Sequence, residues 1–362
     1  MNLRNLLLAS CLLCAALCDA RGQLLIPQVV TNPLPSPLLP VARGGKMGFI
    51  DRDGKVVIEP QFSIPSLYGT KVLTGFKDGL AQIKERDKWG YIDLTGKVVI
   101  QPQFDEAGPF SDGLAAVKSK GKWGYIDKAG QFVAEPQFQE VMRFYEGLAA
   151  VKSKGKWGYI DKTGKFVVQP QFDDASRFKD GVASVNVGGG YANLDPTGKV
   201  LGRCLNECVG LFFDGLAVIR TPVHFGIRTK YGYMNRKGEV VIKPQFDEAG
   251  DFNDGVARVK LTPQDEYNRL PTTNRLYFYI DRDGRRLTRE SFYWAGDFSD
   301  GLAAVQKAEW DKKGYIDRNG QVLIPAKYDE AWPFSEGVAL VQVDGRWGYI
   351  NKSGEFIWGP TK

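Results

Sequence analysis

The sequence contains FSDGLAAVKSKGKWGYIDKAGQFVAEPQFQEVMR at residues 110–143, and FYEGLAAVKSKGKWGYIDKTGKFVVQPQFDDASR follows directly at residues 144–177. The two stretches are identical at 24 of 34 positions. Self-similarity at one fixed period of this length is typical of architectures in which small structural units stack on one another. The duplication therefore predicts a tandem-repeat protein and says more about architecture than about what the protein acts on.

Two short boxes follow the repeat through the chain. The F-x-D/E-G-L/V-A box recurs with spacings of 34, 34, 34, 34, 40, 46 and 36 residues, and the W-G-Y-I-D box occurs nine times, with decay in the middle copies. The first box begins at Phe76, Phe110, Phe144, Phe178, Phe212, Phe252, Phe298 and Phe334, and the second at Met47, Trp89, Trp123, Trp157, Tyr191, Tyr231, Tyr277, Lys313 and Trp347.

The sequence pattern of each unit predicts a three-stranded antiparallel β-meander. Residues 114–118 and 123–127 are short apolar or aromatic runs joined by a Ser-Lys-Gly-Lys turn, which is a hairpin signature. A second turn leads to a third strand at 132–134, which Pro136 helps to end. Gly124 leaves a gap that we expect an aromatic ring of an adjacent unit to fill.

The fold class predicted is all-β, and an open superhelical array is favoured over a closed propeller-like ring. A single unit is too small to form its own core, so neighbouring units must stack. The boxes give eight first strands but nine second and nine third strands, so the surplus lies at the N-terminus. No missing piece at the C-terminus would complete a ring with strands from both ends.

The N-terminal part divides by composition. An apolar run from Leu6 to Leu17 follows Arg4 and precedes Ala20, which is typical of a cleaved signal peptide and too short to span a bilayer. Cys11 also allows lipoprotein anchoring. The predicted organisation is a signal peptide at 1–20, a Pro-rich tether at 21–45, and a repeat array at 46–362 with an N-terminal cap at 46–75 and eight units at 76–362.

The KWGYID boxes at 88–93, 122–127 and 156–161, each followed by a turn and P-Q-F, resemble the bacterial WG-repeat (KWG) family. The resemblance covers residues 46–362. It implies a β-rich repeat protein, commonly exported, with no shared catalytic motif. Departures occur where the box reads Tyr191-Ala192-Asn193, Tyr277-Phe278-Tyr279 and Lys313-Gly314-Tyr315.

Catalytic and metal signals are weak. Carboxylates occur in pairs such as Asp105 and Glu106, but each pair sits at the same repeat position, whereas catalysis needs one asymmetric site. The D-x-x-G turns lack the ligand series of a calcium loop, and aspartate before a glycine turn is explained by local hydrogen bonding. We therefore predict no catalytic residue, no metal site and no cofactor.

Two hairpins are longer than the others. The regular spacing from the Ala of the first box to the tryptophan position is 8 residues, but it is 14 from Ala217 to Tyr231 and 20 from Ala257 to Tyr277. Both additions fall in the same hairpin of consecutive units, so we expect them side by side on one edge, as binding loops or as neutral drift. Candidate ligand-binding residues in them are His224, Phe225, Arg228, Tyr267, Arg269 and Arg275.

Two further sets of residues stand out. Lysines crowd the first hairpin turns and form a basic edge, which either keeps the edge solvated or attracts an anionic polymer. Cys204 and Cys208 are the only cysteines left after signal cleavage, and a local disulfide is predicted. The basic edge comprises Lys118, Lys120, Lys122, Lys152, Lys154 and Lys156.

The function predicted is that of an exported, non-enzymatic protein-interaction scaffold at the cell envelope, periplasmic or secreted, whose partner is a protein or an anionic envelope polymer. Nucleic acid is not expected as a partner because of the export signal, although the formal net charge is +6. No transmembrane span is expected after signal cleavage. Alternatives are a polysaccharide- or peptidoglycan-binding protein, in which aromatic repeats stack on sugar rings, and a hydrolase built into the irregular second half.

Overall fold

The computed structural model describes residues 38–67, 70–71, 73–188, 190–204, 212–220, 229–261 and 276–360. The predicted signal peptide, most of the tether, and both long hairpins lie outside these residues. The chain divides into two compact units, Met1–Phe110 and Ser111–Lys362. Every regular element in the described residues is a β-strand, so the all-β prediction is confirmed.

The repeat folds as the predicted antiparallel meander. In residues 110–143, β10 (Ala115–Ser119) pairs with β11 (Lys122–Ile126), and β11 pairs with β12 (Phe132–Phe138). The turn between the first two strands needs two consecutive left-handed residues, because Lys120 has φ 51° and Gly121 has φ 77°. Such two-residue turns match the right-handed twist of the flanking strands. The Ser-Lys-Gly-Lys motif therefore sets the hairpin register.

The first unit contains two three-stranded meanders of this kind, β1-β2-β3 and β6-β7-β8, together with the small β4-β5 pair. Residues 39–43 form the first strand of the first sheet, so the cap has the strand that sequence analysis did not expect. The strands are β1 (Leu39–Arg43), β2 (Lys46–Ile50), β3 (Val56–Ser63), β4 (Ser66–Leu67), β5 (Thr70–Lys71), β6 (Leu80–Glu85), β7 (Lys88–Asp93), β8 (Val98–Phe104) and β9 (Glu106–Ala107).

The second unit contains seven sheets; six of them are built on such a meander, and in the other the described residues form no third strand. In five of the seven, a two-residue strand of the second unit lies beside the first strand, as β13 lies beside β14 in β13-β14-β15-β16. The remaining strands are β13 (Glu140–Val141), β14 (Leu148–Ser153), β15 (Lys156–Asp161), β16 (Phe166–Phe172), β17 (Asp174–Ala175), β18 (Ala183–Val187), β19 (Gly190–Leu194), β20 (Val200–Cys204), β21 (Leu216–Arg220), β22 (Tyr231–Asn235), β23 (Val240–Phe246), β24 (Glu248–Ala249), β25 (Ala257–Lys260), β26 (Tyr277–Ile280), β27 (Trp294–Ala295), β28 (Ala303–Gln306), β29 (Lys313–Ile316), β30 (Val322–Tyr328), β31 (Glu330–Ala331), β32 (Val338–Val343), β33 (Arg346–Asn351) and β34 (Phe356–Trp358).

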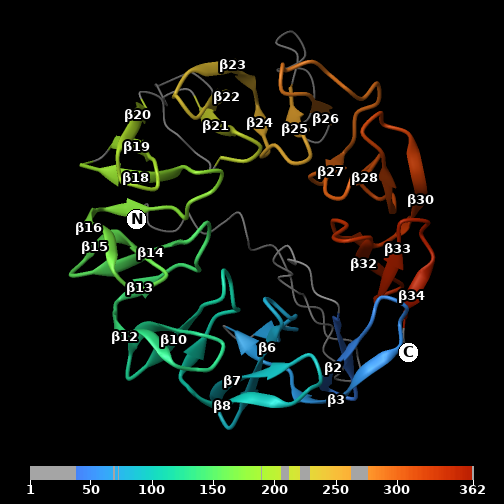
Figure 1. Ribbon diagram of the computed structural model, residues 1–362. Helices are drawn as coiled ribbons and strands as arrows, with labels where there is room; N and C mark the ends of the chain where they lie inside the picture. Colours follow the sequence, from blue (N-terminus) through green and yellow to red (C-terminus); the bar gives the residue numbers. More distant parts are fainter. Residues whose placement is uncertain are drawn as a thin grey trace, which may run out of the picture. The chain divides into compact units, whose positions relative to one another are not determined.

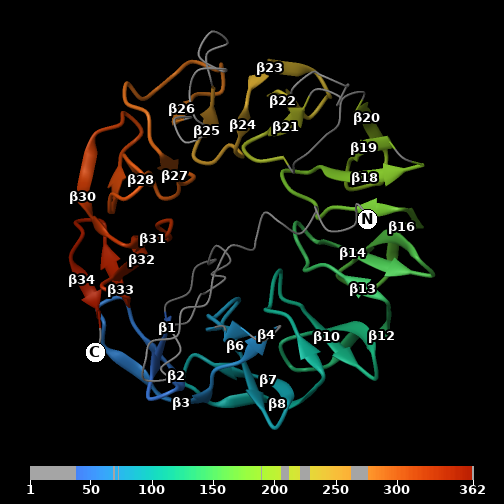
Figure 2. The same cartoon turned by 180° about the vertical axis from the view of Figure 1, so that it is seen from behind.

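The expectation of an open superhelical array is wrong. Within the second unit, successive sheets follow one another as the blades of a β-propeller do, with third strands such as β12, β23 and β30 on the outer side of their first strands (Figures 1 and 2). The strand count that favoured an open array assumed that no first strand precedes Met47, whereas β1 pairs with β2 along its whole length. The first sheet, β1-β2-β3, is therefore a complete blade and not a cap that lacks its first strand.

The glycine of the W-G pair has a different role from the one predicted. Trp123 pairs with Phe138 and Tyr125 pairs with Ala134, so the third strand bulges opposite Gly124. A Cβ atom on Gly124 would lie 2.5 Å from the carbonyl oxygen of Ala134 and 2.8 Å from the nitrogen of Pro136. The space beside the tryptophan is thus filled by backbone of the same sheet and not by a ring from a neighbour.

Tyrosines of the second strand hold each sheet against the next segment of chain. The buried Tyr159 donates a hydrogen bond of 2.8 Å to the carbonyl oxygen of Ser176, and its ring packs edge-on against Phe178 at 4.9 Å between centroids. Burial raises the pKa of the Tyr159 phenol. The same bond recurs 17 residues downstream of Tyr91, Tyr125, Tyr233, Tyr279 and Tyr315.

The acidic residue of the first box joins consecutive blades. Asp254, with φ 54°, accepts a 2.9 Å hydrogen bond through Oδ2 from the backbone nitrogen of Gly301, the equivalent glycine in the next blade. Arg318 lies 4.0 Å from the same oxygen. The other bonds of this type in the second unit join Asp112 to Gly147, Glu146 to Gly181, Asp180 to Gly215, Asp214 to Gly255 and Asp300 to Gly337.

Candidate functional site

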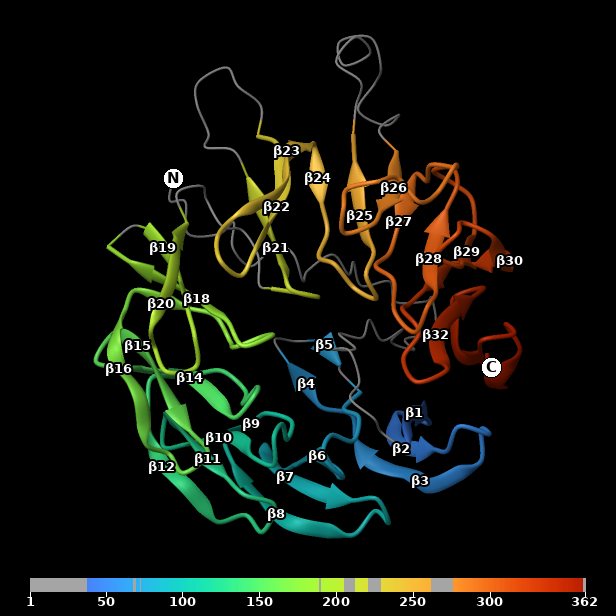
Figure 3. The ribbon, with the colours of Figure 1, turned by 45° about the horizontal axis from the view of Figure 1, so that its top comes forward.

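The most irregular part of the second unit is the pair of sheets that carry the two long hairpins. His224, Phe225 and Arg228 lie outside the described residues, as do Tyr267, Arg269 and Arg275. The strands on either side of these hairpins are described, and β22 begins at Tyr231 while β26 begins at Tyr277. Both tyrosines therefore mark the sheet edge at which the second strands β22 and β26 begin, and Figure 3 shows these strands in consecutive sheets of the second unit.

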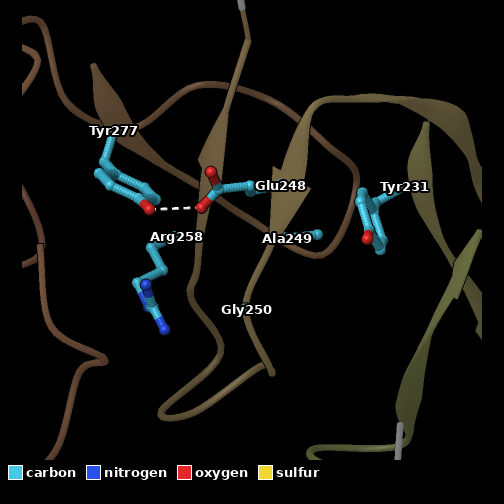
Figure 4. Close-up of a pocket in the computed structure, with 6 residues that line it drawn as sticks. All are labelled: Tyr231, Glu248, Ala249, Gly250, Arg258 and Tyr277. Atoms are coloured by element: carbon cyan, nitrogen blue, oxygen red, sulfur yellow. Dashed lines mark hydrogen bonds between the residues drawn. The ribbon is translucent and has the colours of Figure 1, made fainter. Parts of the chain in front are cut away.

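A pocket of about 190 Å³ lies at this edge. Its lining comes from both sheets, because Tyr231 belongs to β22 whereas Tyr277 belongs to β26, and the short strand β24 runs between them (Figure 4). The other lining residues are Glu248, Ala249, Gly250 and Arg258. Sequence analysis identified the hairpins above this edge but not the pocket residues, although Arg258 stands where regular units have alanine.

Glu248 is the acceptor at the centre of the pocket wall. Its Oε2 atom accepts a hydrogen bond from the Tyr277 hydroxyl, and Lys260 Nζ lies 3.1 Å from Oε1. Lys260 also lies over the Tyr277 ring, 4.7 Å from its centroid. Burial and the nearby carboxylate raise the pKa of Tyr277 to about 12. The phenol therefore stays neutral at neutral pH and remains a hydrogen-bond donor.

Arg258 joins the pocket to a second group of charges. Its Nε atom donates a 2.7 Å hydrogen bond to Asp297 Oδ1. A Cβ atom on Gly250 would lie 2.9 Å from Arg258 Cγ and 3.1 Å from Asp297 Oδ1, so the absence of a side chain at Gly250 makes room for this pair.

Asp251 faces the same charges. Burial raises the pKa of Asp251 to about 6, and the Asp297 carboxylate adds to the rise, whereas the guanidinium groups of Arg258 and Arg177 oppose it. Asp251 and Asp297 occupy equivalent places, each directly before the phenylalanine of a first box. Sequence analysis missed this group. The signal that could have found it is the replacement of arginine by aspartate, because the regular units have Arg143 and Arg177 at this place.

The basic edge is more neutral than its sequence suggests. Lys152 pairs with Glu140 at 2.7 Å and lies over the Trp157 ring, and Lys156 pairs with Asp173. Lys118 lies over the Trp123 ring, 5.6 Å from its centroid. The remaining lysines of this edge, Lys120, Lys122 and Lys154, are exposed.

The paired carboxylates and the D-x-x-G turns are explained by local bonds. Asp173, Asp247 and Asp329 each pair with the lysine 17 residues upstream, directly before the W-G-Y-I-D box. Asp161 accepts backbone hydrogen bonds from Thr163 and Lys165 within its own turn. Among the described residues, no group of three His, Cys, Asp or Glu side chains could hold a metal ion. The Cys204–Cys208 disulfide stays a prediction, because Cys208 lies outside the part of the chain that the structure describes.

The tryptophans of the regular repeats face inward. Trp89 and Trp157 are 3% and 6% exposed, and Trp123 is half-buried. The exception is Trp310, in the hairpin between β28 and β29, which is 91% exposed. None of the described residues forms a helix long and apolar enough to cross a membrane.

The described sheets define a β-propeller-type repeat protein, and the comparison with known protein families also indicates a repeat protein. The family of WG-containing repeats matches residues 47–89, 89–123, 123–157, 157–191, 231–262, 277–309 and 314–347, so the chain belongs to this family. The unmatched residues between 191 and 231 include the degenerate unit in which P-Q-F is lost.

One solved structure supports the propeller-type fold. A eukaryotic initiation factor structure is similar with a TM-score of 0.58 at 10% identity, covering 88% of this chain and 94% of the other. Hsv2 of Kluyveromyces lactis matches at a TM-score of 0.37 and 10% identity, covering 66% of this chain and 90% of the other. No curated protein sequence matches the chain.

Proposed function

We propose that this protein is a non-enzymatic protein-interaction scaffold that acts outside the cytoplasm, at the cell envelope. The observation that carries the proposal is the placement of the irregular residues. Within the second unit, the pocket is lined by Tyr231 and Tyr277, the first residues of the two strands that follow the long hairpins in the chain. In repeat proteins, unit-specific features gathered on one face are where binding tends to reside.

The pocket chemistry favours binding over catalysis. Its carboxylate, Glu248, already accepts a hydrogen bond from Tyr277 and pairs with Lys260, and Arg258 is held by Asp297. These groups form fixed, mutually satisfied contacts of the kind that gives an interface its orientation and specificity. A general acid or base would instead need a reactive group directed at a substrate.

The alternative of a polysaccharide- or peptidoglycan-binding surface on the regular repeats is disfavoured by the burial of Trp89 and Trp157. A sugar-stacking platform needs an accessible aromatic face. The indole rings of the repeat are instead covered by side chains such as Lys152, which lies over Trp157.

The test is a binding experiment with envelope extracts and the full chain. The informative variant shortens the hairpins at 221–228 and 262–275 to Ser-Lys-Gly-Lys, and a matched control replaces the exposed Lys120 and Lys154 with serine in two regular hairpins. We expect the parent and the control to retain the same protein, identified by mass spectrometry, and the shortened variant to lose it. Retention of an insoluble polysaccharide by all three proteins would contradict the proposal.

The export part of the proposal rests on residues 1–20 and has its own test. Fractionation of cells that produce the full chain, followed by sequencing of the mature N-terminus, should recover a chain that begins at Arg21 outside the cytoplasm. A lipid-modified Cys11 would support membrane anchoring, and an intact Met1 in the cytoplasm would contradict export.

A further inference from the structure

Trp310 is exposed to solvent on a hairpin whose backbone is fixed by several hydrogen bonds. Gln306 Nε2 donates hydrogen bonds to the carbonyl oxygens of Glu309 (2.9 Å) and Asp311 (2.8 Å). The backbone nitrogen of Ala308 donates to Asp311 Oδ2 at 3.0 Å, and Asp311 in turn donates its backbone N–H to the carbonyl oxygen of Ala308 at 3.1 Å. The loop is thus ordered around an indole that is 91% exposed. A preorganised tryptophan is the residue type most enriched among binding hot spots.

The Trp310 hairpin leaves the same edge of the unit as the pocket. It joins β28 to β29, the first and second strands of their sheet, just as the long hairpins precede Tyr231 and Tyr277 at the starts of second strands. The sheets β24-β25-β26 and β27-β28-β29-β30 are consecutive along the chain and adjacent in the second unit (Figures 1 and 3). A protruding aromatic side chain and a concave site therefore share one face.

The surroundings of Trp310 favour insertion into a pocket over stacking on a sugar. The neighbouring polar groups are engaged within the protein, because Lys312 pairs with Asp329 and Lys307 pairs with Glu290 at 2.7 Å. Few polar groups beside the ring are left to orient sugar hydroxyls. The loop therefore presents the apolar ring of Trp310, whose indole N–H needs a hydrogen-bond acceptor when the ring is buried.

The pocket has the dimensions and chemistry for such a ring. Its volume of about 190 Å³ exceeds the roughly 150 Å³ of an engineered cavity that binds benzene. Tyr231 and Tyr277 provide aromatic walls from two sheets, and Arg258 provides a guanidinium group that can lie against a π face. Glu248, whose side chain is 52% exposed, provides a carboxylate acceptor for an indole N–H.

We propose that the occupant of the pocket is Trp310 of a second copy of this chain. Because Trp310 and the pocket lie on one face, two copies related by a two-fold axis form two equivalent contacts, as in an isologous dimer. This inference rests on the proposed function, since it names a partner for the same site.

The test is sedimentation velocity of the full mature chain over a wide concentration range. We expect a reversible monomer–dimer equilibrium for the parent, and Trp310→Ala should raise its dissociation constant about 1,000-fold, because the dimer loses a hot-spot residue from each of its two contacts, at about 30-fold for each. Because Trp310 is exposed in the monomer, this variant should unfold like the parent. Tyr231→Ala, which removes one wall of the pocket, should weaken association similarly.

Mixing the two variants separates a knob-and-pocket contact from other interfaces. The Trp310→Ala chain retains an intact pocket and the Tyr231→Ala chain retains an intact tryptophan, so a mixture can form one complete contact. We expect the mixture to associate more tightly than either variant alone.

A parent that is monomeric at all concentrations, or a Trp310→Ala chain that dimerises like the parent, would overturn the dimer. A monomeric parent whose Trp310 fluorescence responds to vesicles or to soluble polysaccharide would also overturn the dimer. Loss of the dimer with continued capture of an envelope protein would leave the proposed function standing.

Discussion

Gly124→Ala should be strongly destabilising because the atoms that a new Cβ meets belong to the backbone. The carbonyl oxygen of Ala134 would lie at 2.5 Å and the nitrogen of Pro136 at 2.8 Å. Neither atom can rotate away as a side chain can. Relief would require the bulge of β12 to move, and with it the pairing of Trp123 with Phe138.

The magnitude follows from the cost of overpacking a tightly packed site, which is typically 1 to 3 kcal/mol. Because the contacts are backbone contacts, we expect a loss at the upper end, about 3 kcal/mol of unfolding free energy. For a unit of this size, a loss of about 3 kcal/mol lowers the melting temperature by roughly 6–12 °C. Urea denaturation followed by circular dichroism measures the free energy, and calorimetry measures the melting temperature.

Gly190→Ala is the matched control. A Cβ on Gly190 would meet only the carbonyl oxygen of Val187, at 3.9 Å. With no clash, the reduced entropy of the unfolded chain should leave the protein unchanged or stabilise it by about 0.4–1 kcal/mol. If Gly124→Ala and Gly190→Ala have the same stability within about 0.5 kcal/mol, the backbone-contact explanation of the W-G pair is refuted.

Three further perturbations test other contacts of the second unit. Tyr279→Phe removes a buried hydrogen bond of 2.6 Å to the carbonyl oxygen of Gly296, and denaturation should show a loss of about 1 kcal/mol; an unchanged midpoint would contradict the role of this bond. Asp254→Ala removes the acceptor for Gly301 and should destabilise by about 1–2 kcal/mol, more than Asp254→Asn, which keeps an acceptor and tolerates φ 54°; equal losses would argue against the bond. Because the folded-state pKa of Asp251 is raised to about 6, its contribution is fully present below pH 4 and is lost as pH rises through 6; Asp251→Asn should therefore match the parent near pH 4 and exceed it at pH 8 by up to roughly 3 kcal/mol, and parallel pH profiles would contradict the shift.

The sequence predicted the strands and hairpins well because each rests on local chemistry. The Lys120-Gly121 turn, the β-branched and aromatic runs and the period of 34 residues are visible within one unit. What the sequence could not give is how one blade meets the next. The hydrogen bond from Gly301 to Asp254 spans 47 residues, and no local pattern distinguishes such an acidic residue from one that only shapes its own turn.

The site was predicted only in outline for a related reason. Counting residues between boxes drew attention to the two long hairpins, which lie outside the described residues, but the pocket is built from residues of two consecutive repeats. Arg258 and Tyr277 look like ordinary drift when each unit is read alone. Their meaning depends on Asp297 and Glu248, which tertiary packing brings to them.

The irregular units show that the glycine of the W-G pair and the bulge of the third strand form one physical feature. Where alanine replaces the glycine, at Ala192, P-Q-F is absent and β20 pairs across that position with β19 without interruption, Tyr191 with Cys204 and Asn193 with Gly202. Where phenylalanine replaces it, at Phe278, the described sheet has no third strand and only isolated bridges remain. A side chain at the glycine position excludes the bulge, whereas the bulge itself does not need P-Q-F: it persists opposite Gly314, where residues 326–328 read Ala-Lys-Tyr. The unit with Phe278 also supplies Tyr277 to the pocket, so the loss of the regular third strand and the pocket occur in the same blade.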